Sequence, residues 1–300
     1  MRRVLVTGAT GFIGQFTLPL LLKKGYEVHA VSSRPVGNGE KDLSWHQANL
    51  LNTEQVSDLL ARVSPSHLLH LAWYTEHGKY WASHQNIQWL KSSLNLLNFF
   101  QKNGGQRTVF AGTCAEYDWT SSLFSEYSTP TQPSTLYGKS KHSLQVILNA
   151  FSRDTGVSSA WGRIFFTFGP MEGPERLVSF IIRSLIKKES APCSKGDQVR
   201  DFLYVEDVAS AFVALLDSQV EGPVNIGSGN PICLKEFIQL IGKKLNAEAL
   251  IRFGEISSPE NDPPSILANV KRLKEEVNWQ PHYDLDSGLN KTIEWWRDYL

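Results

Sequence analysis

The sequence is poor in cysteine. Its 300 residues include only three, Cys114, Cys193 and Cys233, and none of them belongs to a C-x-x-C pair. An odd number of widely spaced cysteines provides neither a disulfide framework nor a zinc knuckle. Free thiols are typical of a reducing compartment, so we expect a cytoplasmic protein.

The sequence also lacks an excess of charge, a long apolar run and a metal-ligand spacing. Its 30 basic residues equal its 30 acidic residues, whereas nucleic-acid-binding proteins usually carry a basic excess. No run approaches the ~18 apolar residues of a membrane span, and Gly8 and Gly11 interrupt the N-terminal apolar stretch, so we expect no signal peptide. The eight histidines show no H-x-x-x-H spacing. We therefore expect no nucleic-acid partner, no membrane partner and no metal.

The first half of the chain alternates short β-rich runs with helical segments. Strands that alternate with helices are typical of a parallel sheet covered by helices on both faces, so we predict a doubly wound α/β fold. The predicted strands are 4–6, 26–31, 67–73, 107–113 and 157–166, and the predicted helices are 12–24, 85–101 and 136–151.

The pattern changes after residue 168, where Gly-Pro pairs interrupt the chain. Beyond them we expect short strands and helices in mixed order, with a proline-rich loop at 257–264. This change of pattern indicates a second, smaller unit. The two predicted parts are a large sheet domain, residues 1–165 with 201–227 returning to it, and a mixed C-terminal lobe, residues 166–200 and 228–300.

Three glycines follow the first predicted strand at a regular spacing. Gly8, Gly11 and Gly14 form G-x-x-G-x-x-G between that strand and a helix. Glycines there let the backbone turn sharply and approach a pyrophosphate, whose charge the helix N-terminus favours. The flanking strand and helix supply the context that a glycine triplet alone lacks. We therefore predict a Rossmann-type dinucleotide-binding domain, with the C-terminal lobe binding the substrate.

The end of the second predicted strand carries no acidic residue. A Rossmann domain for NAD usually places Asp or Glu there, where it accepts hydrogen bonds from the ribose hydroxyls. This sequence has Ser32, Ser33 and Arg34, and a guanidinium with small hydroxyls binds a 2′-phosphate well. We therefore expect NADP(H) to be favoured over NAD(H). The alternative is that Arg34 is an ordinary solvated charge.

Tyr137 and Lys141 form Y-x-x-x-K at the start of a predicted helix. Because of the i,i+4 spacing, both side chains lie on one face of that helix. A phenol has a pKa near ~10, and a neighbouring ammonium is expected to lower it. Thr113 ends a predicted strand at the sheet edge where an α/β fold opens its ligand crevice, so its hydroxyl can bind the same substrate oxygen. Together the three residues predict a site for proton transfer.

With these motifs in this order, the sequence resembles the extended short-chain dehydrogenases/reductases of the nucleotide-sugar epimerase/dehydratase family. The likeness runs nearly end to end. The matching segments are TGATGFIG (7–14), HLA (70–72), Asn86, GTCAEY (112–117), YGKSK (137–141), GRIFFTFGP (162–170), RDFLYVEDV (200–208), NIGSG (225–229) and GL…TIEWW (288–296).

The resemblance implies that NAD(P) binds in the first domain, that a nucleoside-diphosphate sugar binds between the two parts, and that the chain forms a homodimer. It makes Thr113, Tyr137 and Lys141 the catalytic residues, with Tyr137 passing the proton and Lys141 also holding the nicotinamide ribose. Arg200 would meet the substrate diphosphate. The implied cofactor-binding residues are Gly8, Gly11, Phe12, Ile13, Gly14, Ser32, Ser33, Arg34, Asn49, Leu50, Leu71, Ala72, Trp73 and Lys141. The implied substrate-binding residues are Trp73, Tyr74, Thr113, Cys114, Phe166, Arg176 and Arg200.

Three positions depart from the family pattern. Phe166 stands where the family often has Asn, and Asn49 replaces an acidic residue near the adenine. Pro259, three residues before Asp262, stands where an arginine commonly binds the diphosphate. Contacts to the phosphates are therefore expected from Arg176 or Arg252, the alternative being an unusual substrate.

An aromatic-rich segment follows the predicted strand at 67–73. We assign Trp73 and Tyr74 to the lining of the sugar pocket. Tyr80 and Trp81 receive no such role, because at least half of such aromatic side chains simply pack in the core.

The residues after Thr113 bear on the reaction. Dehydratases of the family carry Asp-Glu there, whereas this chain has Cys114 and Ala115, which disfavours water elimination. Because neighbouring strand residues face opposite sides, Cys114 is expected to fill core space rather than act as an acid.

Two reactions remain. One is reduction of a 4-keto-6-deoxy nucleoside-diphosphate sugar with NADPH, which the residues at 32–34 favour. The other is C4 epimerisation of a nucleotide sugar with a tightly bound NAD(P). A non-catalytic NADP-binding regulator is a third reading, which Tyr137 and Lys141 disfavour because such regulators tend to lose one of them.

Overall fold

The computed structural model describes residues 2–36, 42–258 and 262–300, and its larger part is built on a parallel sheet. The strand order is β11-β7-β5-β4-β1-β2-β3, and every neighbouring pair is parallel. Since β1 has β2 on one side and β4 on the other, the strand order reverses at β1, which opens a crevice at the carboxyl ends of the strands. The strands are β1 (Arg3–Thr7), β2 (Glu27–Ser32), β3 (Leu43–Gln47), β4 (His67–His70), β5 (Arg107–Thr113), β7 (Ser158–Ile164) and β11 (Gly222–Ile226).

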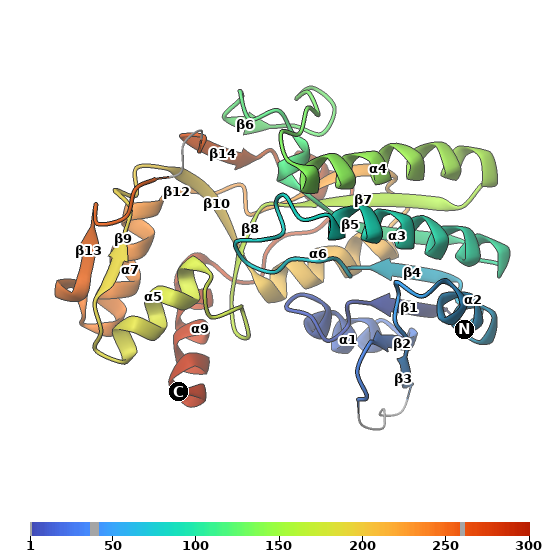
Figure 1. Ribbon diagram of the computed structural model, residues 1–300, viewed down its shortest axis with the longest axis horizontal. Coiled ribbons are helices and arrows are strands. Elements are labelled where there is room, and N and C mark those ends of the chain that lie inside the picture. Colours follow the sequence, from blue (N-terminus) through green and yellow to red (C-terminus); the bar gives the residue numbers. More distant parts are fainter. Residues whose placement is uncertain (1, 37–41, 259–261) are drawn as a thin grey trace.

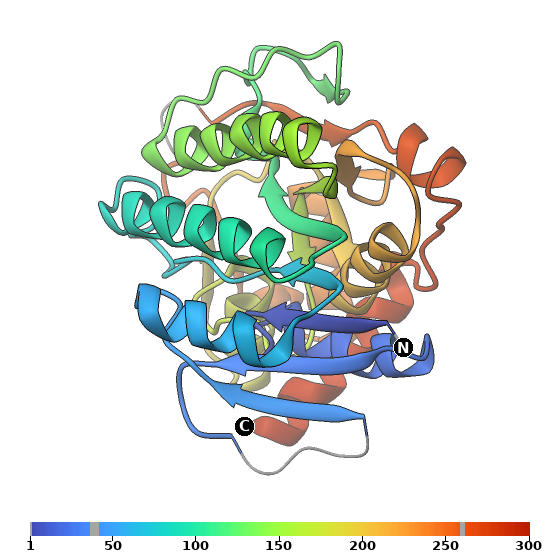
Figure 2. The same ribbon diagram turned by 90° about the vertical axis from the view of Figure 1, so that its right-hand side faces the viewer.

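Helices cover both faces of this sheet, as predicted. Figure 2 shows α2 (Thr53–Val63), α3 (Gln85–Lys102) and α4 (Leu136–Thr155) stacked in one layer. The other face carries α1 (Gly14–Lys23) and α6 (Val205–Asp217), which pack against each other (Figure 1). One apolar core lies under each layer of helices. The doubly wound Rossmann-type α/β fold is thereby confirmed.

A smaller part occupies the left side of Figure 1. Its main sheet has the order β12-β10-β14-β6, β8 pairs with β10, and β13 pairs with β9. A third apolar core lies among these strands and α5, α7 and α9. The remaining elements are η1 (Cys114–Glu116), β6 (Leu123–Phe124), β8 (Phe166–Phe168), α5 (Leu177–Ile186), β9 (Ala191–Cys193), β10 (Val199–Tyr204), β12 (Pro231–Cys233), α7 (Leu234–Leu245), η2 (Glu248–Leu250), β13 (Ile251–Phe253), β14 (Ser265–Ala268), α8 (Lys271–Glu275) and α9 (Leu285–Tyr299).

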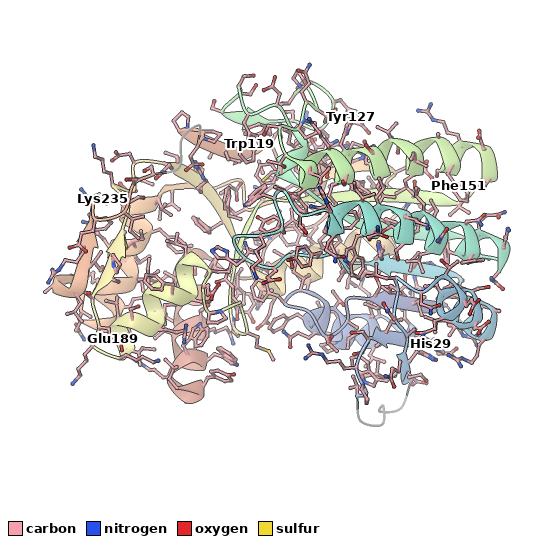
Figure 3. The ribbon with its side chains drawn as sticks, viewed as in Figure 1. His29, Trp119, Tyr127, Phe151, Glu189 and Lys235 are labelled. Atoms are coloured by element: carbon pink, nitrogen blue, oxygen red, sulfur yellow. The ribbon has the colours of Figure 1, made fainter. Side chains whose placement is uncertain are left out.

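Two elements of the large sheet domain were not predicted. β3 is an edge strand whose side chains are half-buried or exposed, so it has neither a continuous apolar run nor a strict alternation. Figure 3 labels His29, a residue of the neighbouring strand β2, near this edge of the sheet, and Trp119 and Tyr127 at the opposite end of the view. The helix α2 did leave a signal, because its buried residues recur at helical spacing after Asn52, whose side chain caps the helix.

The segment 201–227 is shared between the two parts. Its first residues belong to β10, which pairs with strands of the smaller sheet, whereas α6 and β11 belong to the larger part. The strand predicted at 67–73 ends at His70, so the chain is irregular from Leu71 onward. Within the described ranges, no helix is long and apolar enough to cross a membrane.

Candidate active site

A cleft of about 1150 Å³ opens between the two parts, at the carboxyl ends of β1, β4 and β5. Most of the residues predicted for the cofactor and substrate sites line it. They are Gly8, Gly11, Phe12, Ile13, Gly14, Leu71, Ala72, Trp73, Thr113, Cys114, Tyr137, Lys141, Phe166, Arg176 and Arg200. The predicted residues that do not line it are Ser32, Ser33, Arg34, Asn49, Leu50 and Tyr74.

The glycine loop between β1 and α1 leaves no room for a Cβ at Gly8 or Gly14. Gly8 has a φ of +70°, and a Cβ there would lie 2.8 Å from the backbone nitrogen of Ala72. A Cβ on Gly14 would lie 2.0 Å from the carbonyl oxygen of Gly8. The loop lines the cleft at the N-terminus of α1, which is the geometry that a dinucleotide pyrophosphate requires. These residues therefore fit the cofactor that the glycine spacing predicts.

Gly14→Ala is expected to destabilise the protein by about 1–3 kcal/mol, because the new methyl group overpacks the turn. Its dinucleotide affinity should fall as well, since the turn must open. The matched control is Gly173→Ala, whose Cβ would meet no atom closer than 3.8 Å. Thermal unfolding with and without NADPH measures both effects, and equal unfolding temperatures for the two variants would contradict the prediction.

A buried ion pair fixes Thr113 at the end of β5. The carboxylate of Glu116 accepts hydrogen bonds from the Thr113 backbone N–H (2.8 Å) and from Nε of Arg163 (2.9 Å). The Trp161 indole N–H also donates to this carboxylate, at 2.8 Å and 3.0 Å to its two oxygens. The Thr113 hydroxyl accepts from the backbone N–H of Ala115, so its own proton remains available for a ligand.

Tyr137 and Lys141 lie on the cleft side of α4, four residues apart. Burial raises the pKa of the Tyr137 phenol, and the nearby Thr113 hydroxyl opposes that rise only in part. The phenol is therefore protonated at neutral pH, contrary to the lowered pKa predicted from the Y-x-x-x-K spacing. Burial dominates because desolvation disfavours every charged form, and it also lowers the pKa of Lys141 to about 7.

Aromatic rings surround the Tyr137 phenol. The rings of Tyr80 and Trp81 meet it edge-on, with centroids at 4.9 Å and 5.7 Å, and Trp119 packs edge-on against Trp81. All three line the cleft. Tyr74 instead directs its hydroxyl to Glu76 at 2.7 Å. Of the two aromatics predicted to line the cleft, Trp73 does so and Tyr74 does not, while Tyr80 and Trp81 of the same segment line it as well. The irregular backbone from Leu71 onward does not follow strand alternation.

Two arginines and two carboxyl groups also line the cleft, and Arg176 lies over the Tyr80 ring at 5.5 Å. Nη2 of Arg200 forms an ion pair with Asp262 at 2.7 Å, and Arg200 lies over the Phe166 ring at 5.4 Å. Arg176 donates to the Thr75 carbonyl at 3.3 Å. Glu172 is buried, accepts from the Ser179 hydroxyl at 2.9 Å, and has a pKa raised by burial to about 7.

Sequence reasoning gave no role to Glu172 and used Asp262 only as a landmark of the family pattern. The pairing of Asp262 with Arg200 joins residues 62 positions apart, so no local motif contains it. Arg252 lies on β13 and donates to the Ala249 carbonyl, outside the residues that line the cleft. Pro259 lies outside the described residues.

The residues predicted to select the cofactor lie at the end of β2 and just after it, and Asn49 and Leu50 follow β3. The Ser32 hydroxyl accepts from the backbone N–H of Arg34 at 3.1 Å, and the Arg34 side chain is exposed. Asn49 caps its own loop by accepting from the N–H of Leu51. Leu50 is buried in the core under α2 and α3.

Cys114 is not placed by strand alternation. β5 ends at Thr113, and Cys114 begins the 3-10 turn η1. Its side chain therefore packs in the core and also lines the cleft. Burial raises the pKa of its thiol to about 12, so it is not an acid–base group at neutral pH. No cluster of three or more metal-ligand side chains occurs in the part of the chain that the structure describes.

The fold and the cleft together define a dinucleotide-binding enzyme of the extended short-chain dehydrogenase/reductase type. Residues 4–227 match the model of the NAD dependent epimerase/dehydratase family. The chain belongs to this family, which confirms the resemblance seen in the sequence.

Individual relatives are distant but match almost the whole chain. UDP-glucuronic acid decarboxylase 1 of Xenopus tropicalis is 29% identical over 100% of this chain and 73% of that protein. CDP-abequose synthase of Salmonella typhimurium is 28% identical, with 97% of each chain covered. The solved structure of MoeE5 in complex with UDP-glucuronic acid and NAD is 28% identical, with a TM-score of 0.86 over 99% of this chain and 100% of that one.

Proposed function

We propose that this enzyme reduces a 4-keto-6-deoxy nucleoside-diphosphate sugar with NADPH. The observation that carries the proposal is that Thr113, Tyr137 and Lys141 line the same cleft as the glycine loop. The choice of a reductase with NADPH rests on Ser32, Ser33 and Arg34, because the end of β2 carries no carboxylate to repel a 2′-phosphate. The names of the relatives, two of which are nucleotide-sugar enzymes, support the substrate class.

Each proposed catalytic residue has one task. The bound nicotinamide dinucleotide supplies the hydride. Tyr137 donates its phenolic proton to the carbonyl oxygen, a role for which its protonated state at neutral pH is suited. Thr113 donates its free hydroxyl proton as a hydrogen bond to the same oxygen and orients it. Lys141 in its charged form favours the phenolate that remains on Tyr137 after proton transfer.

The Arg200 guanidinium is the proposed contact of the substrate diphosphate, with Arg176 as the second cation. Both line the cleft, and their planar guanidinium groups match phosphate oxygens. Asp262 must release Arg200, or share it, when a diphosphate binds. The smaller lobe, residues 166–200 and 228–300 together with the rest of β10, is accordingly the proposed substrate lobe. Residues 1–165 with α6 and β11 are the proposed dinucleotide domain.

The test is consumption of reduced cofactor. Purified protein is mixed with NADPH or NADH and a panel of nucleotide-linked 4-keto-6-deoxy sugars, and the absorbance of the reduced cofactor is followed. NADPH should be consumed in preference to NADH. Arg34→Ala should raise KM for NADPH by about 10–100-fold, the worth of a charged hydrogen bond, and leave KM for NADH unchanged. Equal use of the two cofactors by the native protein would contradict the proposed selectivity.

A C4 epimerase is the second candidate. Two observations favour it: the solved relative MoeE5 holds NAD, and Arg34 does not line the cleft. An epimerase oxidises and re-reduces its substrate with one retained cofactor. It would consume neither NADPH nor NADH, and denaturation would release a tightly bound dinucleotide.

We further propose that the enzyme is a cytoplasmic homodimer. Its three cysteines are free, as in proteins of a reducing compartment. The neighbouring helices α3 and α4 expose the apolar side chains of Ile87, Val146 and Ile147, which a second copy would cover.

A further inference from the structure

Lys141 is buried without a carboxylate partner in an ion pair. Its side chain is 4% exposed, and Nζ donates to the Ala111 carbonyl at 2.7 Å. Among the described residues no carboxylate forms an ion pair with it. One neutral acceptor replaces the lost water of an ammonium poorly, so burial lowers the pKa of Lys141, and a further group that attracts the cation opposes that fall.

The face of Trp73 is that group. The Lys141 Nζ lies 3.9 Å from the centroid of the Trp73 ring system. Tryptophan is the aromatic residue that attracts a cation most strongly, and the attraction grows when the cation is desolvated. Trp73 stands directly after the HLA segment and lines the cleft beside the glycine loop.

The position of this indole is fixed by a buried amide. The Trp73 indole N–H donates to Oδ1 of Asn86 at 2.8 Å. Asn86 has no exposed surface, and its Nδ2 donates to the carbonyls of Tyr80 (2.6 Å) and Ser83 (2.9 Å). Because all these bonds of Asn86 are made inside the protein, the indole is held in one orientation.

The other titratable groups around Lys141 do not replace Trp73. Glu116 on η1 acts on Lys141 through its charge, but its carboxylate is engaged by Arg163 and Trp161. His70 on β4 is buried and neutral, because burial lowers its pKa to about 3. Tyr137, on the same helix, is also neutral.

We propose that Trp73 is a positioning residue for Lys141: its indole face, anchored by Asn86, holds the ammonium against the Ala111 carbonyl and on the Tyr137 side of α4. This inference rests on the proposed function in one respect, namely that charged Lys141 favours the Tyr137 phenolate. Trp73 thus has a task in the free enzyme besides lining the dinucleotide site.

The test is a direct titration of Lys141 by NMR. Protein labelled with ¹³C at lysine Cε is titrated without cofactor or sugar, and the Lys141 signal is assigned by its loss in Lys141→Met. Trp73→Leu removes the ring that favours the charged form, so the pKa of Lys141, already lowered by burial, should fall by about one further unit. Trp73→Phe keeps an aromatic face without the bond to Asn86, and a smaller fall is expected.

The matched control is Trp81→Leu. It removes another indole from the same cleft, one that contacts Tyr137 and not Lys141, so the Lys141 titration should stay as in the native protein. Unchanged Lys141 titration in both Trp73 variants would overturn the inference, as would equal shifts in Trp73→Leu and Trp81→Leu. If Trp73→Leu does not fold, Trp73→Phe decides.

Enzyme kinetics separate this inference from the proposed reaction. Where turnover is found, the alkaline decline of kcat should move to lower pH in Trp73→Leu by the same amount as the NMR titration. A Lys141 pKa that depends on Trp73, with no turnover on any sugar, would contradict the proposed reaction but support the role of Trp73. Turnover together with a Lys141 pKa that is the same in the native protein and in the Trp73 variants would support the proposed reaction and overturn the role of Trp73.

Discussion

Tyr137→Phe is expected to lower kcat by about 10²–10⁴-fold, the usual contribution of a general acid, while NADPH still binds. The variant loses only the phenolic oxygen, because the ring keeps its edge-on contacts with Tyr80 and Trp81. Turnover is measured by absorbance of the reduced cofactor, and NADPH binding by fluorescence titration.

Tyr80→Phe is the matched control for this variant. It also removes a phenolic oxygen from the cleft, next to Tyr137, but from a residue without a proposed role in proton transfer. Its kcat should fall much less than that of Tyr137→Phe. Native turnover in Tyr137→Phe, or equal losses in the two variants, would remove Tyr137 from the mechanism.

Arg163→Met is expected to lower the free energy of unfolding by about 3–5 kcal/mol, because it leaves the Glu116 carboxylate buried without its cationic partner. The exposed fractions of the two side chains are 2% and 0%, so water cannot replace the guanidinium. The same carboxylate holds the Thr113 backbone, so kcat should fall as well. Denaturant unfolding measures the loss of stability.

The control for Arg163→Met is an exposed ion pair. Lys271 and Glu275 are 3.8 Å apart with side chains 72% and 66% exposed. Exposed pairs contribute about 0–1 kcal/mol, so Lys271→Met should unfold almost like the native protein. A loss in Arg163→Met no larger than in Lys271→Met would show that the buried pair does not stabilise the fold.

Parts of the site could be predicted because their geometry is local. The G-x-x-G-x-x-G loop is a turn between adjacent elements, and Tyr137 and Lys141 share a helix face by their spacing alone. Thr113 followed from the end of a strand in a parallel sheet. Structure and sequence agree that these segments line one cleft.

Other parts depend on contacts between distant segments. Arg200 and Asp262 pair across 62 positions of the chain, and Trp73 meets Lys141 from another element. The pKa of Tyr137 was expected to fall beside a lysine, yet burial raises it. The burial of a group depends on all the residues packed around it, which come from many segments, so a spacing motif cannot predict it.

The sequence by itself determined the doubly wound fold, the dinucleotide loop and the three residues of the candidate catalytic centre. The tertiary structure alone decided that Tyr80, Trp81 and Trp119 join Trp73 in lining the cleft, that Cys114 lies in a turn rather than a strand, and which side chains surround Lys141. The physical reason is the range of the interactions. Turn geometry, helix spacing and strand alternation act between neighbours in the chain, whereas desolvation, ion pairing and aromatic packing act between whichever residues the fold brings together.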